Sequence, residues 1–349
     1  MMIIESTEED VVEKVLERVE PEGEVVIQAP DGLKGLAREL AEEVSRLEDV
    51  ESVVLDAGRV FGACDVTLSL VSSADTLIHL GHYPVPSVDD ALERIGVRTR
   101  VYVPTEGPPV EEWMLEELAE VLRYHGFEDV NLCATAQHVP HLARIERYLR
   151  ERGVEVHVGK GDPERVPVEG LVLGCNVSCV KRDLPTVVVC SGSFHPAGVA
   201  LTTGEPVVQL DPTRGVLDPG DVEEVVRRML TVRLSKTREA VDLEPEDVEV
   251  VGSTALGQVR PDVERALGGV SWRVRYLSED VLRGVGADAC VYCGCPRVPV
   301  DEAARFKRWL VLTPAELASA VEGSWDRYVL DSIPSPEHVT EALERWTRG

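Results

Sequence analysis

The stretch EVVIQAPDG, residues 24–32, indicates how the first part of this chain folds. Its apolar run is typical of a buried strand, and the turn formers at 30–32 end that strand. Apolar residues at helical spacing predict a helix over residues 33–47, and a second apolar run predicts a strand over residues 52–56. A strand, a helix and a second strand in this order form the βαβ unit of a parallel sheet.

The same unit recurs twice along the chain. Its further copies are predicted as strand 130–135, helix 139–152 and strand 154–158, and as strand 248–253, helix 259–267 and strand 271–276. Repetition at this scale indicates similar domains, and Val-rich strands alternating with helices favour parallel sheets covered on both faces. We therefore expect an α/β fold of three similar domains, with parallel sheets flanked by helices, arranged about a pseudo-threefold axis.

The expected domain limits follow from two loop-like stretches. A Pro-rich segment at 104–109 and a turn-rich segment at 211–220 separate the three repeats. The predicted domains are residues 1–105, 106–215 and 216–349. Near the start, Ser6 with Glu9 three residues on predicts a capping box for a helix that runs to Val19, and a helix over 337–346 is expected to close the third domain.

Charge and hydropathy exclude several classes of partner. The net charge of -27 would repel a phosphate backbone, so we expect no nucleic acid to bind. No run of about 18 apolar residues is present, and the acidic start does not resemble a signal peptide. We expect no membrane association and a cytoplasmic location.

Eight cysteines in a cytoplasmic chain favour metal binding or catalysis over disulfides. One cysteine follows each repeated unit, namely Cys64, Cys175 and Cys295. Because ligands bind beyond the carboxyl ends of parallel strands, three domains around one axis would point these thiols at one centre. Thiolates suit iron-sulfur clusters and zinc, and three of them on a four-iron cluster leave one iron open. We expect a shared iron-sulfur cluster.

The remaining cysteines have several interpretations. Cys133 and Cys190 fall in predicted strands, and we expect them to be core residues. For Cys179, Cys290 and Cys293 a second metal, spare thiols and simple packing all remain open.

Local motifs add a resemblance to a known family. The motifs are Phe61-Gly-Ala-Cys-Asp65, Leu77-Ile-His-Leu-Gly-His82, Thr135-Ala-Gln-His138, Leu173-Gly-Cys175, Gly192-Ser-Phe-His-Pro196 and Cys295-Pro-Arg-Val-Pro-Val-Asp301. In this order they resemble the signature of the diphthamide-biosynthesis enzymes, the 2-(3-amino-3-carboxypropyl)histidine synthases. Phe61 stands where the family would have Tyr, and Cys293 competes with Cys295 for the third ligand position.

The resemblance implies a homodimeric archaeal transferase in which Cys64, Cys175 and Cys295 hold a [4Fe-4S] cluster. It implies that S-adenosylmethionine binds at the open iron and that the cluster, reduced by an electron donor, cleaves the bond between sulfur and the γ carbon. The products would be methylthioadenosine and a 3-amino-3-carboxypropyl radical, which adds to C2 of a histidine on translation elongation factor 2. No catalytic residue beyond the cluster is expected.

S-Adenosylmethionine needs polar partners for its amino-acid end and an apolar slot for adenine. The strand-end loops supply as candidate binding residues Gln28, Asp31, Gly32, Gln137, His138, Ser191, Ser193, His195, Gly257 and Gln258. We expect His79 and His82 to be structural hydrogen-bonding residues, while His138 and His195 fit either role. Asp301 is expected to cap the helix that follows it.

Two other functions compete with the transferase. The chain also resembles quinolinate synthase, in which the open iron acts as a Lewis acid on small dicarboxylic substrates. That function needs basic anchors, for which the sequence offers Lys34, Arg59, Arg260 and Arg297. The other alternative is a noncatalytic partner subunit that uses its cysteines for electron transfer or for a structural metal.

Overall fold

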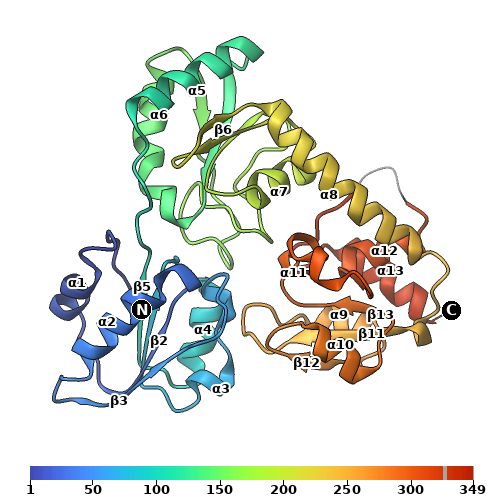
Figure 1. Ribbon diagram of the computed structural model, residues 1–349, viewed down its shortest axis with the longest axis horizontal. Helices are drawn as coiled ribbons and strands as arrows, with labels where there is room; N and C mark the ends of the chain where they lie inside the picture. Colours follow the sequence, from blue (N-terminus) through green and yellow to red (C-terminus); the bar gives the residue numbers. More distant parts are fainter. Residues whose placement is uncertain (325–327, 349) are drawn as a thin grey trace.

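The computed structural model describes residues 1–324 and 328–348, and within these ranges the chain forms three β-sheets, each with its own helices (Figure 1). Parallel pairing dominates all three sheets. The expected α/β architecture of three helix-flanked, mainly parallel sheets is confirmed. The pseudo-threefold axis remains a prediction.

The first sheet has the strand order β1-β5-β4-β2-β3. Its strands are β1 (Met2–Ile3), β2 (Gly23–Gln28), β3 (Val50–Leu55), β4 (Thr76–Leu80) and β5 (Thr99–Val103), and its helices are α1 (Val11–Arg18), α2 (Lys34–Val44), α3 (Leu68–Val71) and α4 (Pro86–Arg94). Short 3₁₀ turns follow β2 at Asp31–Leu33 and β3 at Ala63–Asp65. Two apolar clusters cover the two faces of this sheet, as its continuous apolar strands require.

The expected capping box at Ser6 is wrong. Helix α1 begins at Val11, and its N-cap, Asp10, makes no side-chain capping bond. Ser6 instead forms a bridge with Thr105 beside β5. Sheet pairing of the chain start therefore prevails over the local capping signal.

The second sheet has the order β10-β9-β8-β6-β7, with β10 antiparallel. Its strands are β6 (Asp129–Ala134), β7 (Glu155–His157), β8 (Thr186–Val189), β9 (Val207–Asp211) and β10 (Gly215–Leu217), and its helices are α5 (Glu112–His125), α6 (Leu142–Arg150) and α7 (Phe194–Thr203). A 3₁₀ turn that contains Pro140 precedes α6, so the α-helix begins three residues later than expected.

The third sheet has the order β12-β11-β13-β14. Its strands are β11 (Val248–Ser253), β12 (Trp272–Val274), β13 (Ala289–Tyr292) and β14 (Leu310–Leu312), and its helices are α9 (Pro261–Ala266), α10 (Glu279–Val285), α11 (Arg297–Asp301), α12 (Pro314–Val321) and α13 (Glu337–Arg348). Strand β10 lies across the limit expected between the second and third domains, so the domain limits stay a prediction. Among the described residues, no helix combines the length and the apolar character needed to cross a membrane.

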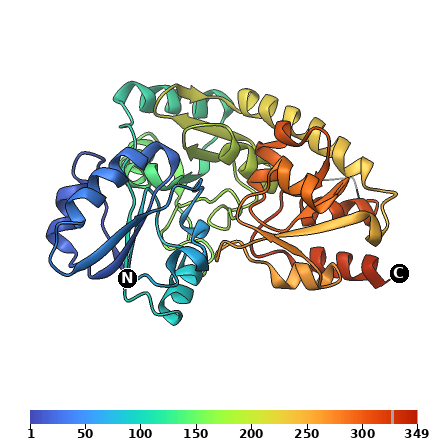
Figure 2. The same ribbon diagram turned by 60° about the horizontal axis from the view of Figure 1, so that its bottom comes forward.

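Helix α8 (Pro219–Glu239) joins the second and third sheets and packs on both (Figures 1 and 2). Asp218 and Asp221 form a capping box at its start. Near its other end, Arg233 is 2 % exposed and donates from Nε to Glu316 Oε1 of α12 at 2.7 Å. It also donates to the carbonyls of Pro299 and Val311, both at 2.9 Å. This side chain ties α8 to the third domain.

Replacing Arg233 with Met is expected to lower the free energy of unfolding by about 3–5 kcal/mol, because Glu316 would stay buried without its cation. Arg228→Met, on the same helix, is the control, since Arg228 is exposed and pairs with Glu224 on the surface. Its expected cost is below about 1 kcal/mol. Urea unfolding followed by circular dichroism measures the free energy of unfolding of both variants. If Arg228→Met lost as much stability as Arg233→Met, the role of Arg233 in tying α8 to the third domain would be contradicted.

Candidate metal centre

The three expected ligand cysteines come from three sheets and meet between them. Cys64 lies in the turn after β3, Cys175 in the long loop between β7 and β8, and Cys295 two residues beyond Cys293 after β13. All three are partly exposed, whereas the other five cysteines are buried. Burial raises the pKa of the Cys64 thiol well above its usual value, and Asp65, Cys295 and Cys175 add to this effect. The three thiols are therefore close enough to interact.

The loop that carries Cys64 is held by the third domain. Thr67 forms an antiparallel bridge with Ala255, and the Leu256 amide donates to the Val66 carbonyl at 2.7 Å. The Gly257 amide donates to the Cys64 carbonyl at 3.1 Å. These main-chain bonds fix the distance between the first and third domains at the thiols.

Gln258 and Arg165 donate to two of the three sulfur atoms. Gln258 Nε2 lies 3.7 Å from Cys64 Sγ, and Gln258 also donates to the Asp65 carboxylate. Arg165 donates from one nitrogen to Cys175 Sγ at 3.7 Å and from another to the Gly257 carbonyl at 3.0 Å. Sequence reasoning missed Arg165, because it stands in a loop without a recognisable motif.

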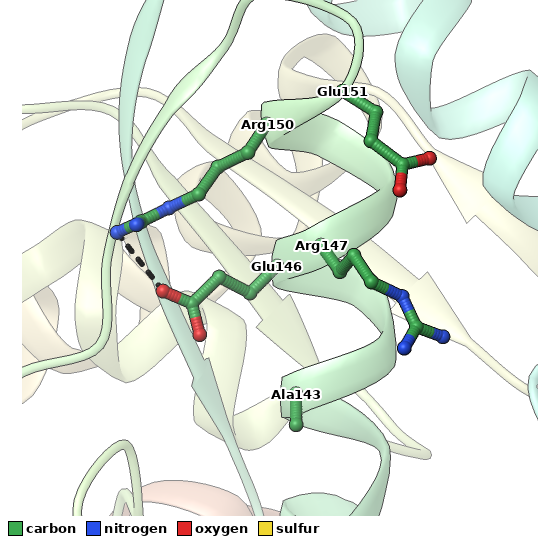
Figure 3. Close-up of a pocket in the computed structure, with 5 residues that line it drawn as sticks. All are labelled: Ala143, Glu146, Arg147, Arg150 and Glu151. Carbon is green, nitrogen blue, oxygen red and sulfur yellow. Dashed lines mark ion pairs between the residues drawn. The ribbon is translucent and has the colours of Figure 1, made fainter.

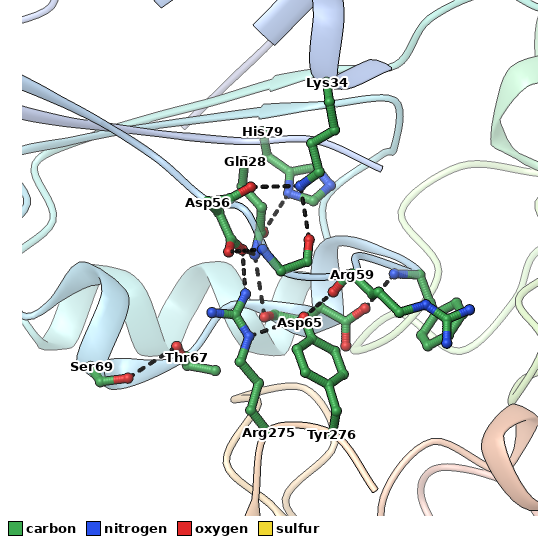
Figure 4. A network of polar contacts seen from close by, with 12 residues as sticks. Gln28, Lys34, Asp56, Arg59, Asp65, Thr67, Ser69, His79, Arg275 and Tyr276 are labelled. Carbon is green, nitrogen blue, oxygen red and sulfur yellow. Dashed lines mark hydrogen bonds and ion pairs between the residues drawn. The ribbon is translucent and has the colours of Figure 1, made fainter. Parts of the chain in front are cut away.

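A polar network supports the Cys64 loop from behind (Figure 4). Gln28 Nε2 donates to Asp56 Oδ2 at 2.8 Å and to the Asp65 carbonyl at 3.3 Å, while Gln28 Oε1 lies 2.9 Å from His79 Nδ1. Arg275 of the third domain reaches Asp56 in the same network. Gln28, a candidate binding residue, is thus fully buried with its amide engaged by the protein.

Histidines from two domains gather beside this network. His79 Nε2 lies 3.0 Å from His82 Nδ1, and the structural role expected of both histidines stays a prediction. Burial lowers the pKa of His82 to about 4. Burial also lowers the pKa of His195 to about 4, with further contributions from Arg297 and His82. Both imidazoles are therefore neutral at pH 7.

The expected cap at Asp301 is wrong. Asp301 ends α11 and accepts a hydrogen bond at 2.8 Å from Arg297 Nε, four residues earlier on the same helix. The turn that follows starts after Glu302 without a side-chain cap. Arg297 and Asp301 are four residues apart on one helix, a spacing that favours an ion pair. The Asp301 carboxylate binds Arg297 and does not cap the turn that follows.

The other candidate binding residues lie at strand ends. Asp31 and Gly32 follow β2, Gln137 follows β6, and Ser191 and Ser193 follow β8, all of them exposed. His138 is buried, and its Nδ1 atom has no partner among the described residues. Nearby, Thr135 Oγ1 also lacks a partner within residues 1–324 and 328–348. The binding roles of these residues remain predictions.

The acid stability of the fold is expected to depend on His138. Burial and the neighbouring His141 lower its pKa to about 4 against an opposing contribution from Asp211. In the unfolded chain His138 binds a proton near its usual pKa of 6.5, whereas in the folded protein it stays neutral until the pH approaches about 4. The free energy of unfolding should therefore fall as the pH drops from about 6.5 towards about 4, and His138→Gln should make this fall shallower in urea titrations. His125→Gln removes an exposed histidine as the control, and identical pH profiles for His138→Gln and the parent would contradict this prediction.

The remaining cysteines are buried in apolar clusters. Cys133 lies in β6 and Cys190 directly after β8, both fully buried, as expected. Cys179 donates to the Leu171 carbonyl at 3.2 Å, and Cys290 and Cys293 belong to the two apolar clusters of the third domain. In the part of the chain that the structure describes, no three His, Cys, Asp or Glu side chains are placed to hold a single metal ion. In a four-iron cluster each cysteine binds a different iron, so the ligands can lie farther apart than around one ion. The finding therefore does not bear on Cys64, Cys175 and Cys295.

A surface hollow on α6 is unrelated to this centre. It is lined by Ala143, Glu146, Arg147, Arg150 and Glu151, with Arg150 paired to Glu146 at 2.9 Å (Figure 3). These residues carry two acids and two arginines on the surface of the helix and include none of the candidate site residues. The hollow is a solvated helix surface.

Comparisons with known proteins agree with the motifs. A family model for diphthamide synthesis proteins matches residues 29–329. The 2-(3-amino-3-carboxypropyl)histidine synthase of Pyrococcus horikoshii is 30 % identical over 328 residues, 88 % of each chain. Subunit 1 of the Gallus gallus synthase is 26 % identical over 96 % of this chain and 81 % of its own length. The crystal structure of Dph2 from Pyrococcus horikoshii with a 4Fe-4S cluster superimposes with a TM-score of 0.74 at 28 % identity, covering 93 % of each chain. With this match over most of its length, the chain belongs to the family of diphthamide synthesis proteins.

Proposed function

We propose that this protein transfers the 3-amino-3-carboxypropyl group of S-adenosylmethionine to C2 of a histidine on translation elongation factor 2, the first step of diphthamide synthesis. One observation carries the proposal. Three thiols from three sheets, Cys64, Cys175 and Cys295, interact at one centre in a chain that is similar to a Dph2 crystallised with a 4Fe-4S cluster. We propose these three as the cluster ligands, in a cytoplasmic homodimer that takes electrons from a separate donor.

The surroundings of the thiols fit a [4Fe-4S] cluster. Such a cluster with three thiolates carries net negative charge, and N–H donors towards its sulfur atoms stabilise that charge. Arg165 and Gln258 supply donors at Cys175 and Cys64. Three cysteine ligands leave one iron free for a substrate.

When bound and reduced, a cluster held by Cys64, Cys175 and Cys295 would supply the one electron that breaks the bond between the sulfonium sulfur and the γ carbon, and methylthioadenosine would leave. The alkyl radical would then add to C2 of the target imidazole. The aromatic ring would be restored when the adduct returns one electron to the oxidised cluster and the C2 proton passes to solvent. Two histidines of this part of the structure add no positive charge that would oppose the binding of a sulfonium cation. Burial lowers the pKa of His82 and of His195 to about 4, so both imidazoles are neutral at pH 7.

The four basic anchors that the sequence offers to the quinolinate synthase alternative already have partners in the protein. Lys34 donates to the carbonyls of Asp56 and Gly58, and Arg59 pairs with Glu302 at 2.7 Å. Arg260 is buried against Asp331, and Arg297 pairs with Asp301. All four candidate anchors for a dicarboxylic substrate are engaged by protein groups.

The test is anaerobic reconstitution with iron and sulfide, followed by dithionite and S-adenosylmethionine, with products identified by mass spectrometry. The expected products are methylthioadenosine together with 2-aminobutyrate or homocysteine sulfinate. Elongation factor 2 added to the same mixture should gain the 3-amino-3-carboxypropyl group on one histidine. Intact S-adenosylmethionine beside a complete cluster would overturn the proposal in favour of Lewis-acid chemistry, and a chain that takes up no iron would favour a noncatalytic partner subunit.

A further inference from the structure

Arg165 is a buried arginine without a carboxylate partner. Four arginines in the described ranges are buried, and three of them pair with an acid: Arg100 with Asp89, Arg233 with Glu316 and Arg260 with Asp331. Arg165 is 5 % exposed and forms no ion pair with any carboxylate in residues 1–324 or 328–348. A buried cation is costly unless an anion compensates it, so its place in the fold indicates an anionic partner.

The guanidinium faces the thiols of the candidate metal centre. One of its nitrogens lies 3.7 Å from Cys175 Sγ, and a second holds the Gly257 carbonyl at 3.0 Å. Through the Gly257 carbonyl the guanidinium also adjoins the Cys64 loop, because the Gly257 amide donates to the Cys64 carbonyl at 3.1 Å. The third nitrogen, Nε, is buried and has no partner among the described residues.

The turn that carries Arg165 is fixed in place. Its amide donates to the Asp162 carbonyl at 3.0 Å, and the Asp162 amide donates to Ser178 Oγ at 2.7 Å, next to the Cys175 loop. The Ser87 amide of α4 donates to the Glu164 carbonyl at 3.0 Å. Contacts to the first domain and to the Cys175 loop therefore pre-organise the guanidinium.

We propose that Arg165 is a positioning residue that holds a fixed positive charge against the cysteine-bound cluster and favours its reduced state. The inference rests on the proposed function, because it takes Cys64, Cys175 and Cys295 as the ligands. Reduction adds one negative charge to an anionic cluster, and a nearby cation in a site of low dielectric stabilises the added charge. Because the guanidinium already donates to Cys175 Sγ, we take the cluster as its anionic partner, and the experiment below separates this from a substrate carboxylate.

The experiment compares the reduction potential of the reconstituted cluster in the parent protein and in Arg165→Gln, Arg165→Lys and Lys160→Gln. Lys160 belongs to the same loop region, and its side chain is 84 % exposed, so it controls for loss of one charge. Potentials come from an electron paramagnetic resonance titration without S-adenosylmethionine, together with iron and sulfide contents. In Arg165→Gln we expect about a tenfold fall in the equilibrium constant for reduction, equal to about 59 mV for one electron. Arg165→Lys should lie closer to the parent, and Lys160→Gln should match it.

The outcomes separate this inference from the function on which it rests. A parent protein that assembles no cluster refutes the proposed function itself. A complete cluster in Arg165→Gln with an unchanged potential overturns the inference alone, and so does an unchanged potential with about tenfold weaker S-adenosylmethionine binding, which would make Arg165 a substrate anchor. If Arg165→Gln assembles no cluster, Arg165→Lys becomes the deciding variant. A cluster in Arg165→Lys with a potential near that of the parent supports the role of the positive charge. If Arg165→Lys also assembles no cluster, the inference is overturned in favour of a purely steric role.

Discussion

Cys295→Ala is expected to abolish cleavage of S-adenosylmethionine, whereas Cys293→Ala, two residues earlier, should retain it. Loss of a ligand-supporting residue around a metal typically costs about 10–100-fold, and loss of a ligand itself should cost at least about 100-fold. Cys295 is partly exposed and interacts with Cys175, while Cys293 is fully buried in the apolar core of the third domain. The sequence alone left Cys293 and Cys295 as competitors for the third ligand position of the cluster. The partial exposure of Cys295 and its interaction with Cys175 favour Cys295.

The comparison uses iron and sulfide content, the visible absorption of the cluster and methylthioadenosine formation after anaerobic reconstitution. Cys293→Ala deletes one buried sulfur and should lower the free energy of unfolding by about 1–2 kcal/mol without loss of iron. Cys133→Ala provides a matched control, because Cys133 is equally buried but lies in the second sheet. A variant set in which Cys293→Ala loses the cluster and Cys295→Ala keeps it would reverse the ligand assignment.

The strands predicted for the three repeated units are all found, because their signal is local and strong, whereas no range was predicted for β1, β4, β5, β8, β9, β10, β13 and β14. The Val-rich run at Val248–Ser253 coincides with β11, and residues 130–135 differ from β6 by one residue at each end. Continuous apolar runs bounded by turn residues leave few alternatives in an α/β fold. Capping signals were less reliable, because Ser6 is taken up by pairing with Thr105 and Asp301 by Arg297.

The candidate centre is only partly visible in the sequence. Cys64, Cys175 and Cys295 could be proposed as ligands because a repeated unit precedes each of them. The resemblance of the surrounding motifs to a known family then supported the same three residues. Arg165 could not be proposed, because an arginine in a polar loop is usually solvated and only the meeting of three domains buries this one. In the same way Gln28, chosen for its strand-end position, proves to support Asp56 and Asp65, a role set by side chains distant in the sequence.

Gly257→Ala is expected to disrupt the centre by pushing the first and third domains apart. A Cβ atom at residue 257 would lie 2.6 Å from Cys64 Cβ, 2.7 Å from Cys64 Cα and 2.7 Å from Val88 Cγ2. Carbon atoms do not approach so closely, and the obstacle at Cys64 is main chain, which cannot rotate away as a side-chain end could. We expect a cost of about 1–3 kcal/mol in the free energy of unfolding from this overpacking.

The functional loss in Gly257→Ala should exceed the loss of stability. A shift of residue 257 would weaken two hydrogen bonds, one from the residue 257 amide to the Cys64 carbonyl and one from Arg165 to the residue 257 carbonyl. The loops that carry Cys64 and Cys175 would therefore shift together. A misplacement of about 1 Å at a reacting centre can cost about 100-fold in rate, and we expect cluster content and methylthioadenosine formation to fall at least tenfold. Gly284→Ala in α10 is the control, since a Cβ there meets no atom within 4 Å and alanine favours the helix. If Gly257→Ala instead assembled a complete cluster at the parent's rate of methylthioadenosine formation, close approach of the third domain to Cys64 would not be what brings the three thiols together.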